Sequence, residues 1–382
     1  MARIYTGDGV DLTPLQGLTI AVIGYGNQGR AQGLNLRDSG LQVLVGNIRD
    51  ASWEQAEADG MKVLPIPEAV REGDVILLLV PDEVAPRVYE ESVAPVLGKG
   101  KVLDVASGYN LAYGFIRPAP EVDVIMVAPR MIGRGVRERF LRGEGFPVLV
   151  GVEQDASGKA WEVALALSRG IGAFLPGGCA VESSCMEETV VDLFSEHTWA
   201  GAFLFLLRAC YEALTSAGVS PEVALLELYA SGELEEVGRA MAEIGLMRQL
   251  RVHSRTSQYG QLTRGPRFVT PEVQRMLREA LEGIRSGEFA REWALEQMVG
   301  MPVYRRRWEE VLEHPMQDVE DRLYQLLRRV PAGAEREGED AKHLPRKARQ
   351  SPWRRSAEAI RRGAGSSPDG SSSRLVPSAW QG

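Results

Sequence analysis

Residues 18–40 read Leu-Thr-Ile-Ala-Val-Ile-Gly-Tyr-Gly-Asn-Gln-Gly-Arg-Ala-Gln-Gly-Leu-Asn-Leu-Arg-Asp-Ser-Gly. The apolar run at 18–23 has the length and β-branching of a strand buried on both faces, and a glycine turn follows it directly. Gly24 permits the tight turn, Gly26 lets a pyrophosphate approach the backbone, and Gly29 lets the next helix pack closely on the strand. A glycine-rich turn between any buried strand and helix is the alternative, but a second strand also follows in order here. The stretch therefore favours a dinucleotide site at a helix N-terminus.

The 382 residues are 44% apolar and 25% charged, as in an ordinary globular protein of two or three domains. The formal net charge of -8 argues against a general nucleic-acid surface, so we expect a small-molecule substrate and no nucleic-acid partner. Cys179, Cys185 and Cys210 form no CxxC pair, which favours a reducing compartment. The N-terminus has no secretory apolar region, and the longest apolar run, 199–207, is shorter than the roughly 18 residues of a membrane span. We therefore expect a cytoplasmic protein without a membrane partner.

Alternating strand and helix patterns continue after the glycine turn. We expect strands at 18–23, 41–45, 74–80, 102–105, 122–128 and 148–152, with helices or turns between them. This order predicts an α/β fold, a Rossmann doubly wound parallel sheet, over residues 1–182. Ligands of such sheets collect at the carboxyl ends of the strands, here near Gly24, Pro81, Ser107 and Pro129.

Strand patterns stop at about residue 182, where helical periodicity takes over. We expect an all-helical second domain over 183–330, with Pro221, Pro271 and Pro302 at helix boundaries. Residues 331–382 are rich in Gly, Ser, Pro and mixed charge, a composition that cannot offset its ordering entropy. We therefore expect a disordered tail in this last segment.

The loop after the second strand bears on the choice between NADP and NAD. An NAD-binding unit normally ends this strand in an acidic residue that holds the ribose 2′-hydroxyl, whereas this chain has Val45-Gly46. Arg49 and Ser52 are placed to hold a 2′-phosphate, although Asp50 would oppose one; a solvated turn with Ser52 capping the next helix is the alternative. We expect NADP, with NAD as the alternative. The predicted cofactor-binding residues are Gly24, Tyr25, Gly26, Asn27, Gln28, Gly29, Arg49, Ser52, Pro81, Asp82 and Gly108.

A second informative stretch, 183–196, reads Ser-Ser-Cys-Met-Glu-Glu-Thr-Val-Val-Asp-Leu-Phe-Ser-Glu. On a helix Asp192 and Glu196 project from one face, because they are four residues apart, beside the apolar Leu193 and Phe194. Paired carboxylates on a half-buried face are hard oxygen ligands for Mg²⁺. Two solvated acids on an exposed face are the simpler alternative from the spacing alone.

Several stretches together resemble ketol-acid reductoisomerases of the short type, over about residues 3–328. These stretches are the glycine turn with residues 31–40, Ala51-Ser52-Trp53-Glu54, the 187–196 helix, and Gly218-Val219-Ser220-Pro221-Glu222. The resemblance implies an NAD(P)H-binding Rossmann domain and a knotted helical domain that dimerises to complete the active site. It also implies Mg²⁺ and a step of branched-chain (isoleucine and valine) amino-acid biosynthesis. In this step an alkyl group migrates in a 2-hydroxy-3-oxo acid (an acetohydroxyacid), and hydride then reduces the resulting 2-oxo acid.

The resemblance also implies roles for individual residues. Asp192 and Glu196 match the family's first pair of metal ligands, and Glu227 matches its next acidic ligand. The family's following acid lies four residues later, where this chain has Ser231, and Glu233 regains the register only if Gly232 distorts the helix. The predicted metal ligands are therefore Asp192, Glu196, Glu227 and Glu233. Ser254, within His-Ser-Arg-Thr-Ser-Gln-Tyr-Gly at 253–260, matches the serine that touches the substrate.

Two positions depart from the family pattern. Residues 106–110 read Ala-Ser-Gly-Tyr-Asn where the family has Ala-His-Gly-Phe-Asn, and Arg130 replaces the lysine of its Ala-Pro-Lys segment. The Ser107 hydroxyl cannot take up a positive charge near neutral pH as histidine does, and arginine keeps its proton. No histidine occurs at 1–196, and His197 either approaches the metal region or is an ordinary helix histidine.

These residues define the expected activity. We expect an NAD(P)H-dependent oxidoreductase of the ketol-acid reductoisomerase type that uses Mg²⁺ and forms a homodimer or a higher oligomer. Its predicted catalytic residues are Ser107, Arg130 and Glu227, and Ser254 is predicted to contact the substrate. Because alkyl migration depends on proton relay more than hydride transfer does, a reductase of 2-oxo acids or imines without migration is one alternative. A cofactor-sensing binding protein without catalysis is the other.

Overall fold

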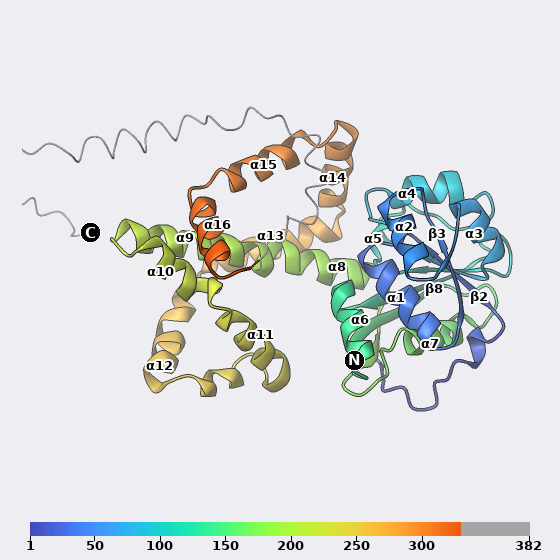
Figure 1. Cartoon of the computed structure of the whole chain (residues 1–382), viewed down its shortest axis with the longest axis horizontal. Helices are drawn as coiled ribbons and strands as arrows, with labels where there is room; N and C mark the ends of the chain where they lie inside the picture. The colour runs from blue at the N-terminus through green and yellow to red at the C-terminus, as the bar shows by residue number, and fades with distance from the viewer. Residues whose placement is uncertain (330–382) are drawn as a thin grey trace, which may run out of the picture. The chain divides into compact units, whose positions relative to one another are not determined.

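A nine-stranded sheet forms the core of the N-terminal half, in the order β1-β9-β8-β7-β6-β5-β2-β3-β4 (Figure 1). The structure is a computed structural model that describes residues 1–329, so the tail predicted at 331–382 lies outside the described residues. The strands are β1 Ile4–Tyr5, β2 Thr19–Ile23, β3 Gln42–Gly46, β4 Lys62–Leu64, β5 Val75–Leu78, β6 Val102–Val105, β7 Asp123–Pro129, β8 Pro147–Gln154 and β9 Cys179–Glu182.

The centre of the sheet is parallel, as the sequence predicts. β2 pairs in parallel with β3 and β5, and β6 pairs in parallel with β5 and β7. The expectation that the strand at 148–152 is also parallel to its neighbour is wrong, because β8 runs antiparallel to β7. The chain between them re-enters the sheet beside the point where it left, and the Arg130 amide donates to the Pro147 carbonyl at 2.9 Å.

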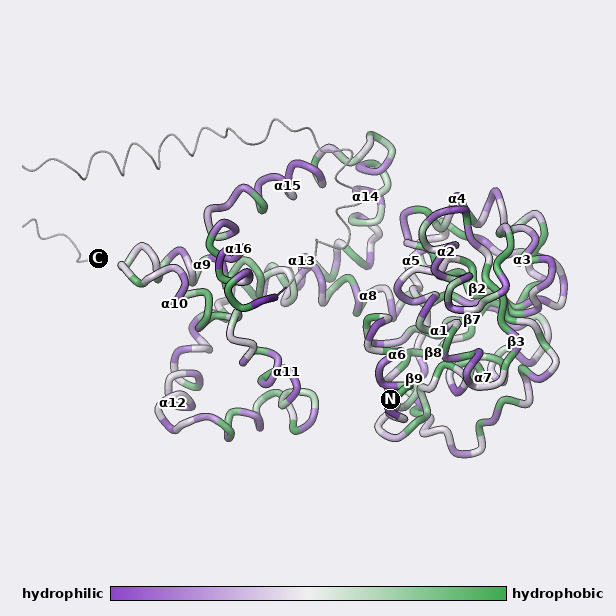
Figure 2. The backbone as a smooth tube through the Cα atoms, viewed as in Figure 1, coloured by the Kyte–Doolittle hydropathy of each residue, from purple (hydrophilic) through white to green (hydrophobic). Residues whose placement is uncertain are grey.

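Helices cover both faces of this sheet (Figure 1). Successive residues of β2 point to opposite faces, so Ile20 and Val22 join one core cluster while Ala21 and Ile23 join the other. All four side chains are fully buried, which explains the continuous apolar run in the sequence and the hydrophobic strands in Figure 2. The first face packs against α1 Asn27–Asp38, α6 Gly133–Leu141 and α7 Ala160–Gly170, and the second against α3 Ile66–Glu72, α4 Ala85–Val88 and η2 Tyr89–Val93.

The strand order creates a crevice beside β2. The chain passes from β2 to β3 on one side and later returns to β5 on the other, so the connections after β2 and β5 diverge there. Ligands of open α/β sheets bind in such a crevice, at the carboxyl ends of the strands.

The remaining short helices of this half are η1 Thr13–Leu15, α2 Ala51–Ala58 and α5 Tyr109–Ala112.

Residues after β9 are helical, as predicted. The first run, Cys185–Ser216, consists of α8 Cys185–Ser195, the π-helical η3 Glu196–Ala200 and α9 Gly201–Ser216. It is long and apolar enough in composition to cross a membrane, and 11% of its most apolar window is buried. The other elements are α10 Pro221–Leu225, η4 Leu226–Ala230, α11 Glu233–Ile244, η5 Arg248–Val252, α12 Arg255–Arg264, η6 Gly265–Phe268, α13 Pro271–Arg285, α14 Glu288–Met298 and α15 Pro302–Leu312. Helix α16, Met316–Leu326, belongs to a second unit that begins at Pro315.

Candidate active site

The glycine turn after β2 has the geometry of a dinucleotide-binding turn. Gly24 has a φ of 90°, and a Cβ there would lie 2.8 Å from a Val80 methyl carbon. A Cβ on Gly29 would lie 1.9 Å from the Gly24 carbonyl oxygen, so only glycine lets α1 begin this close to the turn. At Gly26 a Cβ would meet no atom within 4 Å, so the backbone there is open to a ligand. These three positions fit a bound dinucleotide.

Neighbouring residues of the turn divide into buried and accessible positions. Gly26 and Asn27 are exposed and Gln28 is half-buried, at the open N-terminus of α1. Gln28 donates from Nε2 to the Met131 carbonyl at 2.9 Å, which ties α1 to the segment after β7. Tyr25 is instead buried, and its hydroxyl donates to Asp59 at 3.1 Å, so its side chain supports the turn from below.

The loop between β3 and α2 differs from the expectation at one residue. Asp50 is the N-cap of α2, because its Oδ1 accepts from the amides of Ser52 at 2.9 Å and Trp53 at 3.1 Å. The alternative in which Ser52 caps the helix is therefore wrong. Asn47 donates to the same Asp50 oxygen at 2.9 Å, and the Arg49 guanidinium lies 4.8 Å from the centre of the Trp53 ring. The Asp50 charge is thus partly satisfied by the helix N-terminus.

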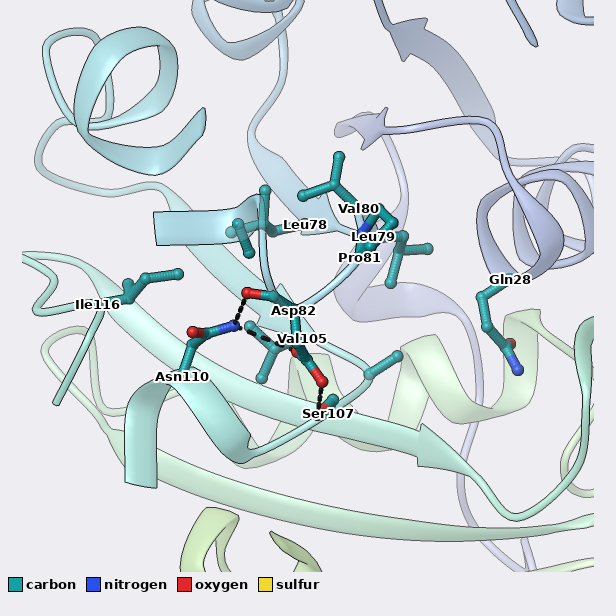
Figure 3. A pocket seen from close by; sticks show the side chains of 12 residues that line it. Gln28, Leu78, Leu79, Val80, Pro81, Asp82, Val105, Ser107, Asn110 and Ile116 are labelled. Carbon is teal, nitrogen blue, oxygen red and sulfur yellow. Dashed lines mark hydrogen bonds between the residues drawn. The ribbon is translucent and has the colours of Figure 1, made fainter. Parts of the chain in front are cut away.

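A cavity of about 180 Å³ lies at the carboxyl ends of β5 and β6, and Gln28 of α1 lines its other side (Figure 3). The Ser107 hydroxyl donates to Asp82 Oδ2 at 3.1 Å, and Asn110 Nδ2 donates to Asp82 Oδ1 at 3.2 Å. Burial raises the pKa of Asp82 to about 6, and the nearby carboxylates of Glu83 and Asp192 also raise it. The cavity therefore contains a carboxyl group that titrates close to neutral pH.

Helix α8 and the first residue of η3 carry a row of carboxylates spaced four residues apart. Glu188, Asp192 and Glu196 are its members, and Arg130 at the end of β7 donates to Glu188 Oε1 at 2.7 Å and to Asp192. Burial raises the pKa values of Glu188 and Glu196, and the Asp192 charge raises both further. Asp192 also raises the pKa of Asp82, so its carboxylate lies within electrostatic reach of the cavity.

Glu188 is a site residue that the sequence reasoning missed. The amide of Gly108 donates to Glu188 Oε2 at 2.8 Å, and a Cβ on Gly108 would lie 2.3 Å from the Cys185 carbonyl oxygen. Gly108 thus packs beneath α8, and its amide is already bonded. The spacing of four residues that marks Asp192 and Glu196 extends back to Glu188 and is the signal that points to it.

Other predicted residues lie outside this region of the chain. Glu227 is exposed in the π-helical η4, Glu233 is the exposed first residue of α11, and Ser254 is the N-cap of α12. Gly232 has a φ of 94° between η4 and α11, so the helix breaks where the sequence required a distortion. Among residues 1–329, no three or more His, Cys, Asp and Glu side chains are grouped to hold a metal ion. The assignment of Glu227 and Glu233 as metal ligands stays a prediction.

His197 packs against an aromatic ring of the helical part. Its ring centre lies 4.2 Å from that of Phe289, with the planes at 66°, and burial lowers its pKa. This geometry favours the reading of an ordinary helix histidine.

The chain is similar to known proteins over both of its parts. The family model described as "Acetohydroxy acid isomeroreductase, NADPH-binding domain" matches residues 14–177, and "Ketol-acid reductoisomerase, C-terminal domain" matches residues 186–329. A ketol-acid reductoisomerase (NADP(+)) of Pyrobaculum aerophilum is 45% identical over 86% of this chain and 99% of its own. A relative from Saccharolobus solfataricus, whose name also refers to ketol-acid reductoisomerases, is 50% identical over 83% of this chain and 96% of its own. The structure of an NADH-preferring ketol-acid reductoisomerase from an uncultured archean matches with a TM-score of 0.81 and 38% identity, over 85% of this chain and 99% of that one.

The Rossmann sheet, the glycine turn and the helical second part define the class as an NAD(P)-dependent oxidoreductase. Within this class, both family models and the relatives matched along nearly their whole length identify the family of the chain. The chain belongs to the ketol-acid reductoisomerase family.

Proposed function

We propose that the protein is an NADPH-dependent ketol-acid reductoisomerase that converts an acetohydroxyacid in branched-chain amino-acid biosynthesis, in the cytoplasm. One observation carries the proposal: in a chain of this family, Gln28 of the glycine turn lines the cavity at the carboxyl edge of the sheet, and the Asp192 carboxylate of α8 acts electrostatically on Asp82 in that cavity. The match of both domains to the family does not favour the alternatives of a migration-free reductase or a cofactor sensor.

The NADPH part of the proposal is supported by the loop after β3. Strand β3 ends without an acid, Arg49 lies against Trp53 beside the start of α2, and Asp50 is bonded to the amides of that helix. The family model that matches this domain is described as NADPH-binding, and the Pyrobaculum aerophilum relative is named for NADP(+).

Mg²⁺ is also part of the proposal, and the donor set of α8 fits it. The Asp192 charge raises the pKa values of three neighbouring carboxyl groups, Asp82, Glu188 and Glu196, while Arg130 supplies a single guanidinium charge beside them. A divalent cation on hard carboxylate oxygens would relieve this repulsion. Asp192 and Glu196 would hold the ion, and bound Mg²⁺ would polarise the oxygens of the substrate.

We propose that a second copy of the chain completes the site, as a homodimer. The helical part leaves much apolar surface uncovered: of the sixteen residues of α9, only Tyr211 is buried, and helices α11, α12 and α15 bury none. Leu204 and Phe205 on α9 are 65% and 60% exposed. Contiguous apolar surface of this kind marks a protein interface. Such a dimer would bring a partner's acidic residues and Ser254 equivalent to the α8 carboxylates.

The chain's own residues have separable tasks in this proposal. Gly26 lets the cofactor approach the backbone, and Arg130 fixes Glu188 and Asp192 so that α8 stays beside the cavity.

The test is an assay of the full-length protein with NADPH, Mg²⁺ and an acetohydroxyacid, with the dihydroxy acid identified by mass spectrometry. Cofactor oxidation that yields this product supports the proposal. Oxidation only with 2-oxo acids, or none, contradicts it.

A further inference from the structure

Neither a histidine nor a lysine of the described chain lines this cavity, so neither can carry a proton there. Among residues 1–329 the histidines are His197, His253 and His314, and they contact Phe289, Gln249 and Glu212 respectively, all outside the cavity. Arg130 is bound to two carboxylates and keeps its proton. The proposed alkyl migration nevertheless moves one proton within the substrate, so another group must carry it.

The hydrogen bonds around Ser107 define which group donates to its hydroxyl oxygen and which group accepts its hydrogen. The Tyr109 amide donates to Ser107 Oγ at 3.4 Å, so the oxygen acts as an acceptor on that side. Ser107 then donates its own hydrogen to Asp82 Oδ2 at 3.1 Å. The hydroxyl is therefore positioned to receive a proton on its free lone pair while it passes its own proton to the carboxylate.

Asp82 is held so that only one of its oxygens faces Ser107. Asn110 Nδ2 donates both to Asp82 Oδ1 at 3.2 Å and to the Asp82 carbonyl at 3.1 Å, which fixes the carboxyl against α5 (Figure 3). Asp82, Ser107 and Asn110 all line the cavity, together with Gln28 of the dinucleotide turn. Both members of the pair thus face the space next to the open glycine turn.

We propose that Asp82, acting through the Ser107 hydroxyl, accepts and returns the proton that the substrate moves during alkyl migration. This inference rests on the proposed function and names a proton acceptor for it. Ser107 is the catalytic residue that touches the substrate, and Asp82 acts through it.

The proton and electron balance closes within the substrate and this pair. The C2 hydroxyl gives its proton to Ser107 Oγ as the Ser107 proton passes to Asp82 Oδ2, and the C2–O bond becomes a carbonyl. The alkyl group moves from C2 to C3 with its electron pair, and the C3 carbonyl becomes an alkoxide. The proton returns from Asp82 through Ser107 to the C3 oxygen, so the step is an isomerisation without net oxidation. Bound NADPH would supply the hydride that reduces the C2 carbonyl, and a proton from solvent would complete the hydroxyl.

The charged surroundings suit a carboxyl that shuttles a proton. Burial places the pKa of Asp82 at about 6, where both forms are accessible near neutral pH. The titratable groups that face it are Glu83 in its own turn, Tyr109 on α5, and Asp192 and Glu196 from the α8 side. The carboxylates favour the protonated form, and the bonds from Ser107 and Asn110 favour the ionised form.

The test compares five variants of the full-length protein with wild type on an acetohydroxyacid, with NADPH and Mg²⁺, from pH 5 to 9. Asp82→Asn is expected to lower kcat by roughly 100- to 10,000-fold and to remove the acidic limb of the pH profile. Ser107→Ala is expected to lower kcat while the carboxyl stays in place. Glu83→Gln, which removes an exposed neighbouring charge, is the matched control and is expected to keep the limb.

Ser107→His provides the decisive background. A histidine there handles the proton itself, so Asp82→Asn is expected to cost much less in Ser107→His than in wild type. An equal loss in both backgrounds, or an unchanged acidic limb in Asp82→Asn, would overturn the inference. If Asp82→Asn fails to bind NADPH, the Ser107→Ala variant decides by itself, and wild-type kcat in it overturns the inference. Absence of wild-type turnover on the acetohydroxyacid would instead refute the proposed function.

Discussion

Arg130 and Asp192 form an ion pair that joins the end of β7 to helix α8. The same guanidinium bonds the buried Glu188 at 2.7 Å, so one side chain of the sheet holds two carboxylates of the helix. A guanidinium is suited to this because its fixed fork of donors reaches two acceptors at once. Arg130 therefore orients Asp192, which we propose as a metal ligand, together with the buried Glu188.

Asp192→Asn is expected to abolish the stabilisation of the protein by Mg²⁺ while it leaves NADPH binding intact. The substitution removes one charge from the carboxylate set, and the glycine turn lies on separate elements. Thermal melts with increasing Mg²⁺ measure the effect, and NADPH fluorescence measures cofactor binding. Glu187→Gln, on an exposed position of the same helix, is the control and keeps the Mg²⁺ response. An equal response in Asp192→Asn and wild type removes Asp192 from the metal site.

The buried carboxyl of Asp104 in β6 is expected to make the free energy of unfolding depend on pH. Its side chain is fully buried, Oδ1 accepts from the Val127 amide at 3.0 Å, and Oδ2 has no hydrogen-bond partner among the described residues. Burial raises its pKa well above the usual value, so the folded state keeps this carboxyl protonated. Its contribution to stability is complete below the unfolded pKa and is lost as pH rises toward the folded pKa, by about 1.4 kcal/mol per pH unit.

Asp104→Asn is therefore expected to flatten this part of the stability curve. The amide oxygen keeps the bond from Val127, and no proton has to stay bound as pH rises. Urea unfolding at pH 5 and pH 8 measures both variants. A loss of stability between those values that is the same in Asp104→Asn and wild type would mean that Asp104 does not titrate.

Sequence patterns were sufficient for the main strands because each is a buried apolar run that helices cover on both sides. The short strands β1, β4 and β9 were not predicted, because they are only partly buried and so lack the continuous apolar run that marks the equally short but fully buried β5 and β6. The direction of β8 also escaped prediction. It depends on where residues 130–146 re-enter the sheet, which no local pattern encodes.

The candidate site could be predicted in part for a similar reason. Local geometry fixes the glycine turn and the helical spacing of Asp192 and Glu196, so both were readable from residue order. The contacts of Arg130 and the pairing of Ser107 with Asp82 join elements that lie 62 and 25 residues apart, and only the fold reveals them. The position of Glu227 depends on packing beyond its own helix.

NADPH is expected to bind more tightly than NADH, and Arg49→Ala is expected to reduce that preference. Arg49 lies against Trp53 beside the start of α2, where its positive charge favours a 2′-phosphate, while Asp50 is bonded to the helix amides. Fluorescence titration of both reduced cofactors measures the ratio. Tighter NADH binding by wild type would mean that the Asp50 charge governs this pocket.

Phe205→Asp is expected to convert a homodimer into a monomer. Phe205 is 60% exposed on a helix whose surface is otherwise largely uncovered, and burying a carboxylate in an apolar interface costs several kcal/mol. Light scattering after gel filtration measures the mass. Leu141→Asp is the control, since Leu141 is similarly exposed on α6 of the sheet half, and its mass should equal that of wild type. A monomeric wild type, or an unchanged mass in Phe205→Asp, would contradict the dimer.

Alanine at Gly26 and at Gly29 is expected to separate cofactor binding from folding. A Cβ at Gly26 meets no protein atom within 4 Å and the residue has a φ of -83°, so Gly26→Ala is expected to fold with nearly unchanged stability. It is also expected to weaken NADPH binding at least tenfold, because the methyl group fills the space where the pyrophosphate approaches the backbone.

Gly29→Ala places its methyl group 1.9 Å from the Gly24 carbonyl oxygen, so the turn or α1 has to move. We expect a loss of roughly 1–3 kcal/mol in the free energy of unfolding, the usual cost of overpacking. Urea unfolding without cofactor and NADPH titration, applied to both variants, give the two quantities separately. If Gly26→Ala binds NADPH as wild type does, the turn is a structural connection only, and the dinucleotide must bind elsewhere along the carboxyl edge of the sheet.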